Sequence, residues 1–126
     1  MTELKIGKKS IGEGNPNYIM ADIGLTHGGD FNTAIKLIDI AAEVGVDAIK
    51  FQMIDPEVLL GDKSVTYTFP TVNDGKVTEN MYQMFKGLGY SKKQWKELKT
   101  HANRRGLEFI CTAHFYDAVI VLEELE

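Results

Sequence analysis

Two polar side chains close an otherwise apolar segment of this 126-residue chain. Lys50 and Gln52 end the run that starts at Gly45. Because strand side chains alternate between the two faces of a sheet, Lys50 and Gln52 point the same way if the run is a strand. An ammonium and an amide at the carboxyl end of a buried strand can bind an anionic substrate. A strand end that merely reaches solvent would carry the same two residues.

Further polar residues stand at or just past the ends of apolar segments. They are Asp22, Thr26, His27, Thr112 and His114. Asp22 could act as a general base or bind a hydroxyl, or its carboxylate could accept from backbone donors of the next loop. His27, in a glycine-bearing loop, could carry a proton or donate a hydrogen bond, or could pack at the surface. His27 and His114 could hold a metal together, although no third ligand stands at diagnostic spacing.

Alternating strands and helices must position these residues. Strands are predicted over 18–24, 46–52 and 107–112, and helices over 30–44, 91–105 and 118–126. The helix from Ser91 has the sequence of a capping box with Gln94, and Tyr90 and Trp95 stand at the positions of a hydrophobic staple. We expect a small β-hairpin within 1–17 and a long polar excursion over 54–90, with one short helix at 79–85.

The segments that start at Gly45 and Gly106 share one pattern: glycine, apolar, acidic, apolar, isoleucine. Such a repeated βα unit builds a parallel sheet through right-handed crossovers. A closed (β/α)8 barrel needs about 250 residues. The fold class is therefore predicted to be α/β, as the N-terminal portion of a TIM barrel with about three βα units. Aligning the two repeats sets Cys111 opposite Lys50 and turns Thr112 to the other face, unless a bulge restores it.

Composition restricts the class of protein. A net charge of −4 without a Lys/Arg-rich stripe argues against binding nucleic acid. No apolar run approaches the roughly 20 residues that span a bilayer, and the N-terminus lacks the apolar core of a signal peptide. The single Cys111 cannot form an internal disulfide and is expected to pack as a small apolar residue. We therefore expect a cytoplasmic protein without membrane association.

Together, these segments resemble the sialic acid synthase (N-acetylneuraminate synthase) family. The matching stretches are 4–7, 11–16, 21–24, 47–52 and 106–112. The resemblance implies condensation of phosphoenolpyruvate with an N-acylhexosamine such as N-acetylmannosamine, giving a nine-carbon sugar acid and phosphate. It also implies that Lys50, Gln52 and Thr112 bind phosphoenolpyruvate. Asp22, near the reacting carbons, and His27 become the catalytic candidates.

The chain departs from the family pattern at three places. Asp22 stands where the family usually has Glu, Thr26–Gly29 replaces Asn-His-Asn-Gly, and 111–115 replaces an ending in Ser-Thr-Pro-Phe. These departures concern the sugar more than phosphoenolpyruvate, and they fit a branch that makes legionaminic, pseudaminic or a related acid.

The resemblance also implies a divalent metal, Mn or Mg, whose ligands lie outside this chain, so we assign no metal ligand here. Residues 1–126 are accordingly predicted to be the N-terminal part of the barrel, with a hairpin at 1–17 and an insertion at 54–90, and to be inactive alone.

Two other interpretations remain. The chain could belong to another TIM-barrel phosphosugar aldolase or isomerase, for example one that forms a Schiff base on Lys50; borohydride trapping would reveal this. It could instead be a non-catalytic half-barrel that pairs with a partner chain or with itself as a homodimer.

Overall fold

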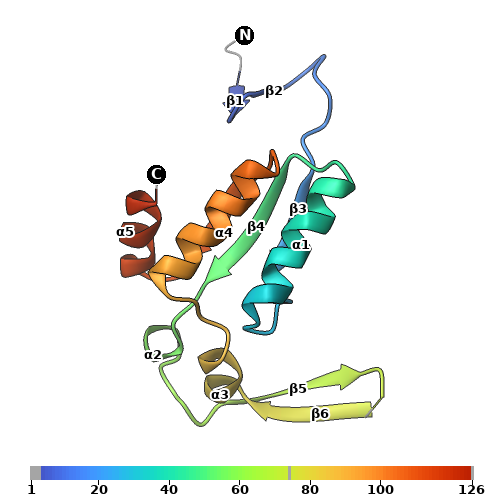
Figure 1. Ribbon diagram of the computed structural model, residues 1–126. Coiled ribbons are helices and arrows are strands. Elements are labelled where there is room, and N and C mark those ends of the chain that lie inside the picture. Colours follow the sequence, from blue (N-terminus) through green and yellow to red (C-terminus); the bar gives the residue numbers. More distant parts are fainter. Residues whose placement is uncertain (1–3, 74, 126) are drawn as a thin grey trace.

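The computed structural model describes residues 4–73 and 75–125. Strands and helices alternate along much of the chain (Figure 1). In chain order the elements are β1 (Leu4–Ile6), β2 (Lys9–Ile11), β3 (Met20–Gly24), α1 (Phe31–Glu43), β4 (Ala48–Met53), α2 (Pro56–Leu59), β5 (Thr66–Thr71), β6 (Gly75–Asn80), α3 (Met81–Lys86), α4 (Lys92–Arg104), β7 (Glu108–Ala113) and α5 (Tyr116–Glu124).

A three-stranded parallel sheet in the order β3-β4-β7 is the centre of the molecule. A helix returns the chain after each strand: α1 after β3, α4 after β4 and its long excursion, and α5 after β7. In Figure 1, α1 and α4 lie side by side over the same face of β3 and β4. The prediction of an α/β fold with about three βα units is confirmed, although the third helix begins two residues earlier than expected, at Tyr116.

The packing of β4 decides which way its polar residues point. Ile49 and Phe51 are fully buried in the helix-side core, where they join Ile38 of α1 and Leu98 of α4. Burying each large apolar side chain contributes about 1.5–3 kcal/mol. Because strand residues alternate, this packing forces Lys50 and its second neighbours to the opposite face of the sheet.

The helix termini follow their predicted caps. Asp30 caps α1, accepting from the Thr33 N–H at 2.6 Å. Ser91 and Gln94 form the predicted capping box of α4, in which the Gln94 side chain accepts from the Ser91 N–H at 2.9 Å. The Tyr90 and Trp95 rings, 5.2 Å apart, complete the predicted staple. These contacts define where α1 and α4 begin.

The hairpin β1–β2 forms within 1–17, as predicted, although residues 1–3 of that range lie outside the described residues. It is tied to the sheet by Asp47, which is buried just before β4. The Asp47 carboxylate accepts from the Ile19 N–H at 2.7 Å and pairs with the Lys9 ammonium. The hairpin is thereby anchored at the amino-terminal end of the sheet, opposite the candidate residues.

The excursion over 54–90 has more regular structure than the sequence analysis expected. Besides α2 and α3 it contains the antiparallel hairpin β5–β6, which extends away from the rest of the molecule in Figure 1. The predicted helix at 79–85 forms as α3, but it starts at Met81 because Glu79 and Asn80 belong to β6. The Glu57 carboxylate binds Lys63 and the Tyr82 hydroxyl, which joins α2 to α3.

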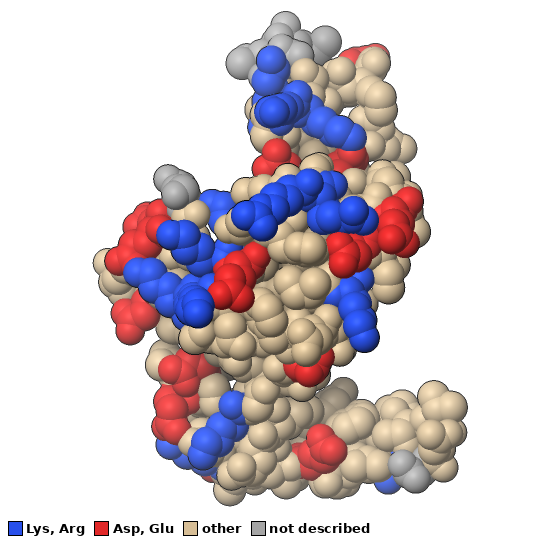
Figure 2. All heavy atoms as spheres, in the orientation of Figure 1, with Lys and Arg blue, Asp and Glu red and all other residues tan. Residues whose placement is uncertain are grey.

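The surface carries charges of both signs. Figure 2 shows Lys and Arg side chains interspersed with Asp and Glu over the helix-covered face. Within the described residues, no helix combines the length and the apolar character needed to cross a bilayer.

Candidate functional site

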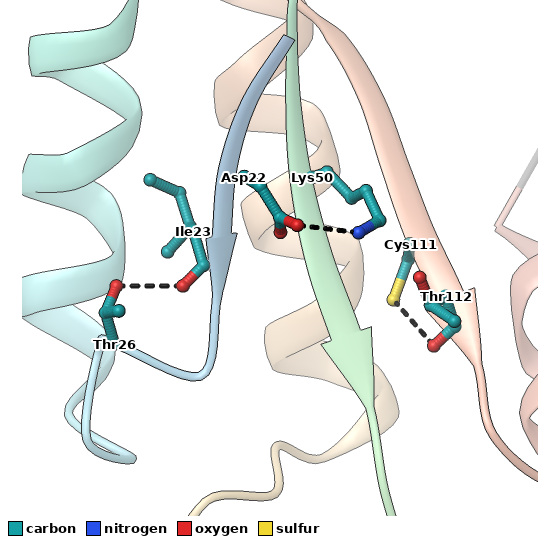
Figure 3. Close-up of polar contacts among 6 residues, drawn as sticks. All are labelled: Asp22, Ile23, Thr26, Lys50, Cys111 and Thr112. Carbon is teal, nitrogen blue, oxygen red and sulfur yellow. Dashed lines mark hydrogen bonds and ion pairs between the residues drawn. The ribbon is translucent and has the colours of Figure 1, made fainter.

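Four polar residues share one face of the three parallel strands, from the middle of β3 and β4 towards the carboxyl ends of β4 and β7. Asp22 of β3 pairs in register with Lys50 of β4, and Gln52 of β4 pairs with Thr112 of β7. Residues paired across parallel strands project from the same face. We call the face that carries Asp22, Lys50, Gln52 and Thr112 the Lys50 face; it is the side of the sheet opposite α1 and α4. Figure 3 draws three of these residues, Asp22, Lys50 and Thr112.

An ion pair joins the two charged residues of this face. The Lys50 ammonium lies 2.8 Å from the Asp22 carboxylate. The Lys50 side chain is 24% exposed and the Asp22 side chain 51% exposed, so the pair is open to a ligand. Because an ammonium has three N–H donors and Asp22 uses one, the same nitrogen can also bind the oxygens of an anion.

The register predicted from the sequence repeat is wrong by one residue. Cys111 lies opposite Phe51, and Thr112 lies opposite Gln52. The reason is that the turn before β4 is one residue longer than the turn before β7. β4 begins at Ala48, after Asp47 has anchored the chain, whereas β7 begins two residues after Gly106. Thr112 therefore shares the face of Lys50 without needing a bulge.

Cys111 faces the helices, where it packs against the core. Burial raises the pKa of its thiol to about 12. Since the thiolate is the nucleophilic form, Cys111 is not activated for covalent chemistry near neutral pH. The expectation that it packs as an apolar residue agrees with this position.

His27 is not brought to the other candidates. It is buried, with 2% exposure, and its ring centroid lies 6.0 Å from that of Phe51 and 4.8 Å from that of Tyr90. Its Nδ1 lies 3.0 Å from the Gly29 nitrogen and 2.7 Å from the Tyr90 hydroxyl oxygen. Burial lowers the pKa of His27. These contacts place it in the helix-side layer, and its predicted catalytic role stays a prediction.

Thr26 and His114 lie on the loops that follow β3 and β7. The Thr26 hydroxyl donates to the Ile23 carbonyl at 2.8 Å, and the exposed His114 donates its backbone N–H to the Met53 carbonyl at 3.3 Å. The described part of the chain contains no group of three or more His, Cys, Asp or Glu residues arranged to hold a metal. The described residues therefore do not fit a metal site.

A pocket of about 390 Å³ opens near the same end of the sheet. It lies between α2, α3 and α4, and Glu57, Tyr82 and Trp95 are among its lining residues. The four residues of the Lys50 face do not line it. The pocket is therefore separate from the candidate site.

Comparison with known proteins identifies the class. Residues 37–126 match the family model described as the NeuB family. The chain is 36% identical over 110 residues to the N,N'-diacetyllegionaminic acid synthase of Campylobacter jejuni, an alignment that covers 85% of this chain and 32% of that protein. It is 30% identical over 115 residues to the N-acetylneuraminate-9-phosphate synthase of Mus musculus, with 91% and 32% covered.

A solved structure agrees with the family match. The N-acetylneuraminic acid synthetase of Leptospira borgpetersenii superposes with a TM-score of 0.79 at 30% identity, over 98% of this chain and 38% of that one. The chain thus belongs to the NeuB family, and its fold corresponds to part of the TIM barrel of these proteins. It spans about a third of the length of the relatives that it matches.

Proposed function

We propose that this chain is part of a phosphoenolpyruvate-condensing sugar acid synthase and that the Lys50 face binds phosphoenolpyruvate. The observation that carries the proposal is the strand register, which gathers an ammonium, an amide and a hydroxyl on one face in the carboxyl-terminal part of the parallel strands. In TIM barrels this end of the sheet is where substrates bind. Family membership supplies the reaction class.

Each residue has a definite part in this proposal. Lys50 binds the phosphate of phosphoenolpyruvate through the N–H donors that Asp22 does not use. Gln52 and Thr112, side by side across β4 and β7, donate from their amide and hydroxyl to the remaining oxygens. Asp22 lies beside Lys50, where its carboxylate is close to the reacting carbons and limits how much negative charge the face accepts.

The acceptor is proposed to be an N-acylhexosamine, and the product a nine-carbon sialic-acid-type sugar acid with release of phosphate. The relatives include both a diacetyllegionaminic acid synthase and an N-acetylneuraminate-9-phosphate synthase. Their identities to this chain are 36% and 30%, too close to each other to choose one acceptor.

A divalent metal, Mn or Mg, is part of the proposal for the whole enzyme only. Bound at its site, such an ion would polarise the acceptor carbonyl. Since the described residues do not form a metal site, we derive no step through it.

The organisation of the chain follows from the same proposal. Residues 1–126 form the N-terminal part of the barrel, with the hairpin at 1–17 and the insertion at 54–90. A homodimer and a cytoplasmic location belong to this proposal as well.

Titration with phosphoenolpyruvate tests the function. We expect the chain to bind it with a Kd on the order of 1 mM, and Lys50→Met to weaken binding at least tenfold because the charge-assisted contact is lost. Lys96→Met, which removes the same charge from the exposed surface of α4, should leave the affinity unchanged. Equal effects of the two variants would contradict the assignment.

A further inference from the structure

Two loops that are distant in the sequence meet at the buried His27. One is the segment 25–30 between β3 and α1, and the other is the segment 87–91 that ends the excursion and starts α4. The Tyr90 hydroxyl lies 2.7 Å from His27 Nδ1 and 3.1 Å from the Asp30 carbonyl oxygen. The Tyr90 ring also contacts Phe31 and Trp95, at centroid distances of 5.9 and 5.2 Å.

The contacts of His27 determine its tautomer. The Gly29 N–H can only donate, and it lies 3.0 Å from Nδ1. We therefore assign the neutral tautomer with its proton on Nε2, in which the one lone pair of Nδ1 is shared between the Gly29 N–H and the Tyr90 O–H, and the single Tyr90 proton is also shared with the Asp30 carbonyl. Nε2 is buried and has no hydrogen-bond partner among the described residues. All of the ring's observed polar contacts are therefore made through Nδ1.

The two loops also touch through their backbones. Gly29 has a φ of +80°, and a Cβ there would lie 1.9 Å from the Gly87 carbonyl oxygen. Only glycine allows this approach. At its other end, the loop follows Gly24, the last residue of β3, where a Cβ would lie 3.4 Å from Gln52 Nε2 and 3.7 Å from the Asp22 carboxylate. The loop is thus held at one end by the excursion and lies at the other against the Lys50 face.

We propose that His27 is a positioning residue: its unprotonated Nδ1 joins Gly29 and Tyr90, and this latch fixes the loop that borders Asp22 and Gln52. His27 then acts on the ligand through the loop rather than by touching it. The effect of His27 on phosphoenolpyruvate binding rests on the proposed function. The latch, which consists of the contacts of His27 with Gly29 and Tyr90, does not depend on it.

The ring and the acceptor atom contribute separately, and variants of His27 can separate them. His27→Phe keeps a ring beside Phe51 and Tyr90 but removes the acceptor. His27→Asn keeps an acceptor oxygen near the place of Nδ1 but removes the ring. Tyr90→Phe removes only the hydroxyl. His101→Phe on α4, on the helix side of the sheet, and Tyr116→Phe at an exposed position are the matched controls.

The first experiment uses NMR on the 15N-labelled 126-residue chain. Long-range proton–nitrogen correlations should show a proton on Nε2 of His27 and none on Nδ1. Exchange of the Gly29 amide should be about tenfold faster in His27→Phe, faster also in Tyr90→Phe, and no faster in the double variant than in His27→Phe, because the three groups act as one unit. His27→Asn should restore most of the protection. A proton on Nδ1, or additive effects, would overturn the latch.

The second measurement links the latch to the ligand. His27→Phe and Tyr90→Phe should weaken phosphoenolpyruvate binding about threefold to tenfold, His27→Asn should recover part of it, and both controls should match the wild type. If His27→Phe loosens the Gly29 amide but binds phosphoenolpyruvate as His101→Phe does, the positioning role is wrong. If the wild-type chain binds no phosphoenolpyruvate, the proposed function fails, and the tautomer and exchange data alone decide the latch.

Discussion

At the scale of single residues, the central feature is the ion pair between Lys50 and Asp22. The Lys50 ammonium pairs with Asp22 at 2.8 Å, while Gln52 and Thr112 lie in register one pleat further along the same face. The carboxylate orients the lysine, but it also repels any anion that approaches. Affinity for a phosphate is therefore set by the balance between one cation and one neighbouring anion.

This balance gives a prediction for Asp22. Asp22→Asn should tighten phosphoenolpyruvate binding by about fivefold, because it removes a negative charge a few ångströms from the bound phosphate. Glu97→Gln, which makes the same charge change on the exposed side of α4, should have no such effect. Calorimetric titration at low and high salt measures both, and the gain should shrink as salt rises. Weaker binding by Asp22→Asn would mean that the carboxylate contacts the ligand favourably.

His27 gives a prediction for pH. Burial among Phe51 and Tyr90 lowers the pKa of its imidazole, and protonation would also replace the Nδ1 acceptor with a donor facing the Gly29 N–H. The unfolded chain therefore binds this proton more readily than the folded chain. The stabilisation is complete above the unfolded pKa of about 6.5 and is lost as pH falls below it towards the folded value.

Urea denaturation at several pH values between 7.5 and 5 tests this sign. The midpoint of the wild type should fall with pH more steeply than that of His27→Phe, which cannot titrate. Charged groups near the latch, such as Asp30, are common to both proteins and cancel in the comparison. Parallel pH dependence in the two proteins would show that His27 does not titrate in this way.

At the scale of elements, the sequence predicts the secondary structure of each segment more reliably than it predicts how the segments pack together. The cap at Asp30 and the capping box at Ser91 are local signals, and both form as predicted. The register between β4 and β7 is not local. It depends on the buried carboxylate of Asp47, whose partners Lys9 and Ile19 lie 38 and 28 residues away. A change of one residue in the turn inverted the predicted face of Thr112.

The same division holds for the candidate site: the residues of single strands were predictable, whereas contacts between distant segments were not. Lys50, Gln52 and Asp22 follow from alternation along apolar strands, which local composition reveals. The environment of His27 could not be predicted from local sequence, because its partner Tyr90 stands 63 residues further along the chain. The hairpin β5–β6 did carry a local signal, the alternation of polar and apolar residues from Thr66 to Phe69, which the polarity of the surrounding segment masked.

At the scale of the whole molecule, we propose that the chain supplies one part of an active site. It spans about a third of the length of its relatives, and the described residues form no metal site. We therefore predict that residues 1–126 do not condense phosphoenolpyruvate with N-acetylmannosamine, even with Mn²⁺ or Mg²⁺ present. A coupled assay for inorganic phosphate measures this, and release above the blank without chain would contradict it.

The most direct test of the central claim is to map where phosphoenolpyruvate binds. Titration of the 15N-labelled chain should shift the backbone amides of Lys50, Gln52 and Thr112 together, with one common Kd. The amides of Leu98 and Ala102, buried on α4 behind the sheet, should stay unchanged. The same shifts should vanish in Lys50→Met and persist in Lys96→Met. Shifts confined to the helix side, or a Lys50→Met variant that binds as well as the wild type, would show that the Lys50 face is not the phosphoenolpyruvate site.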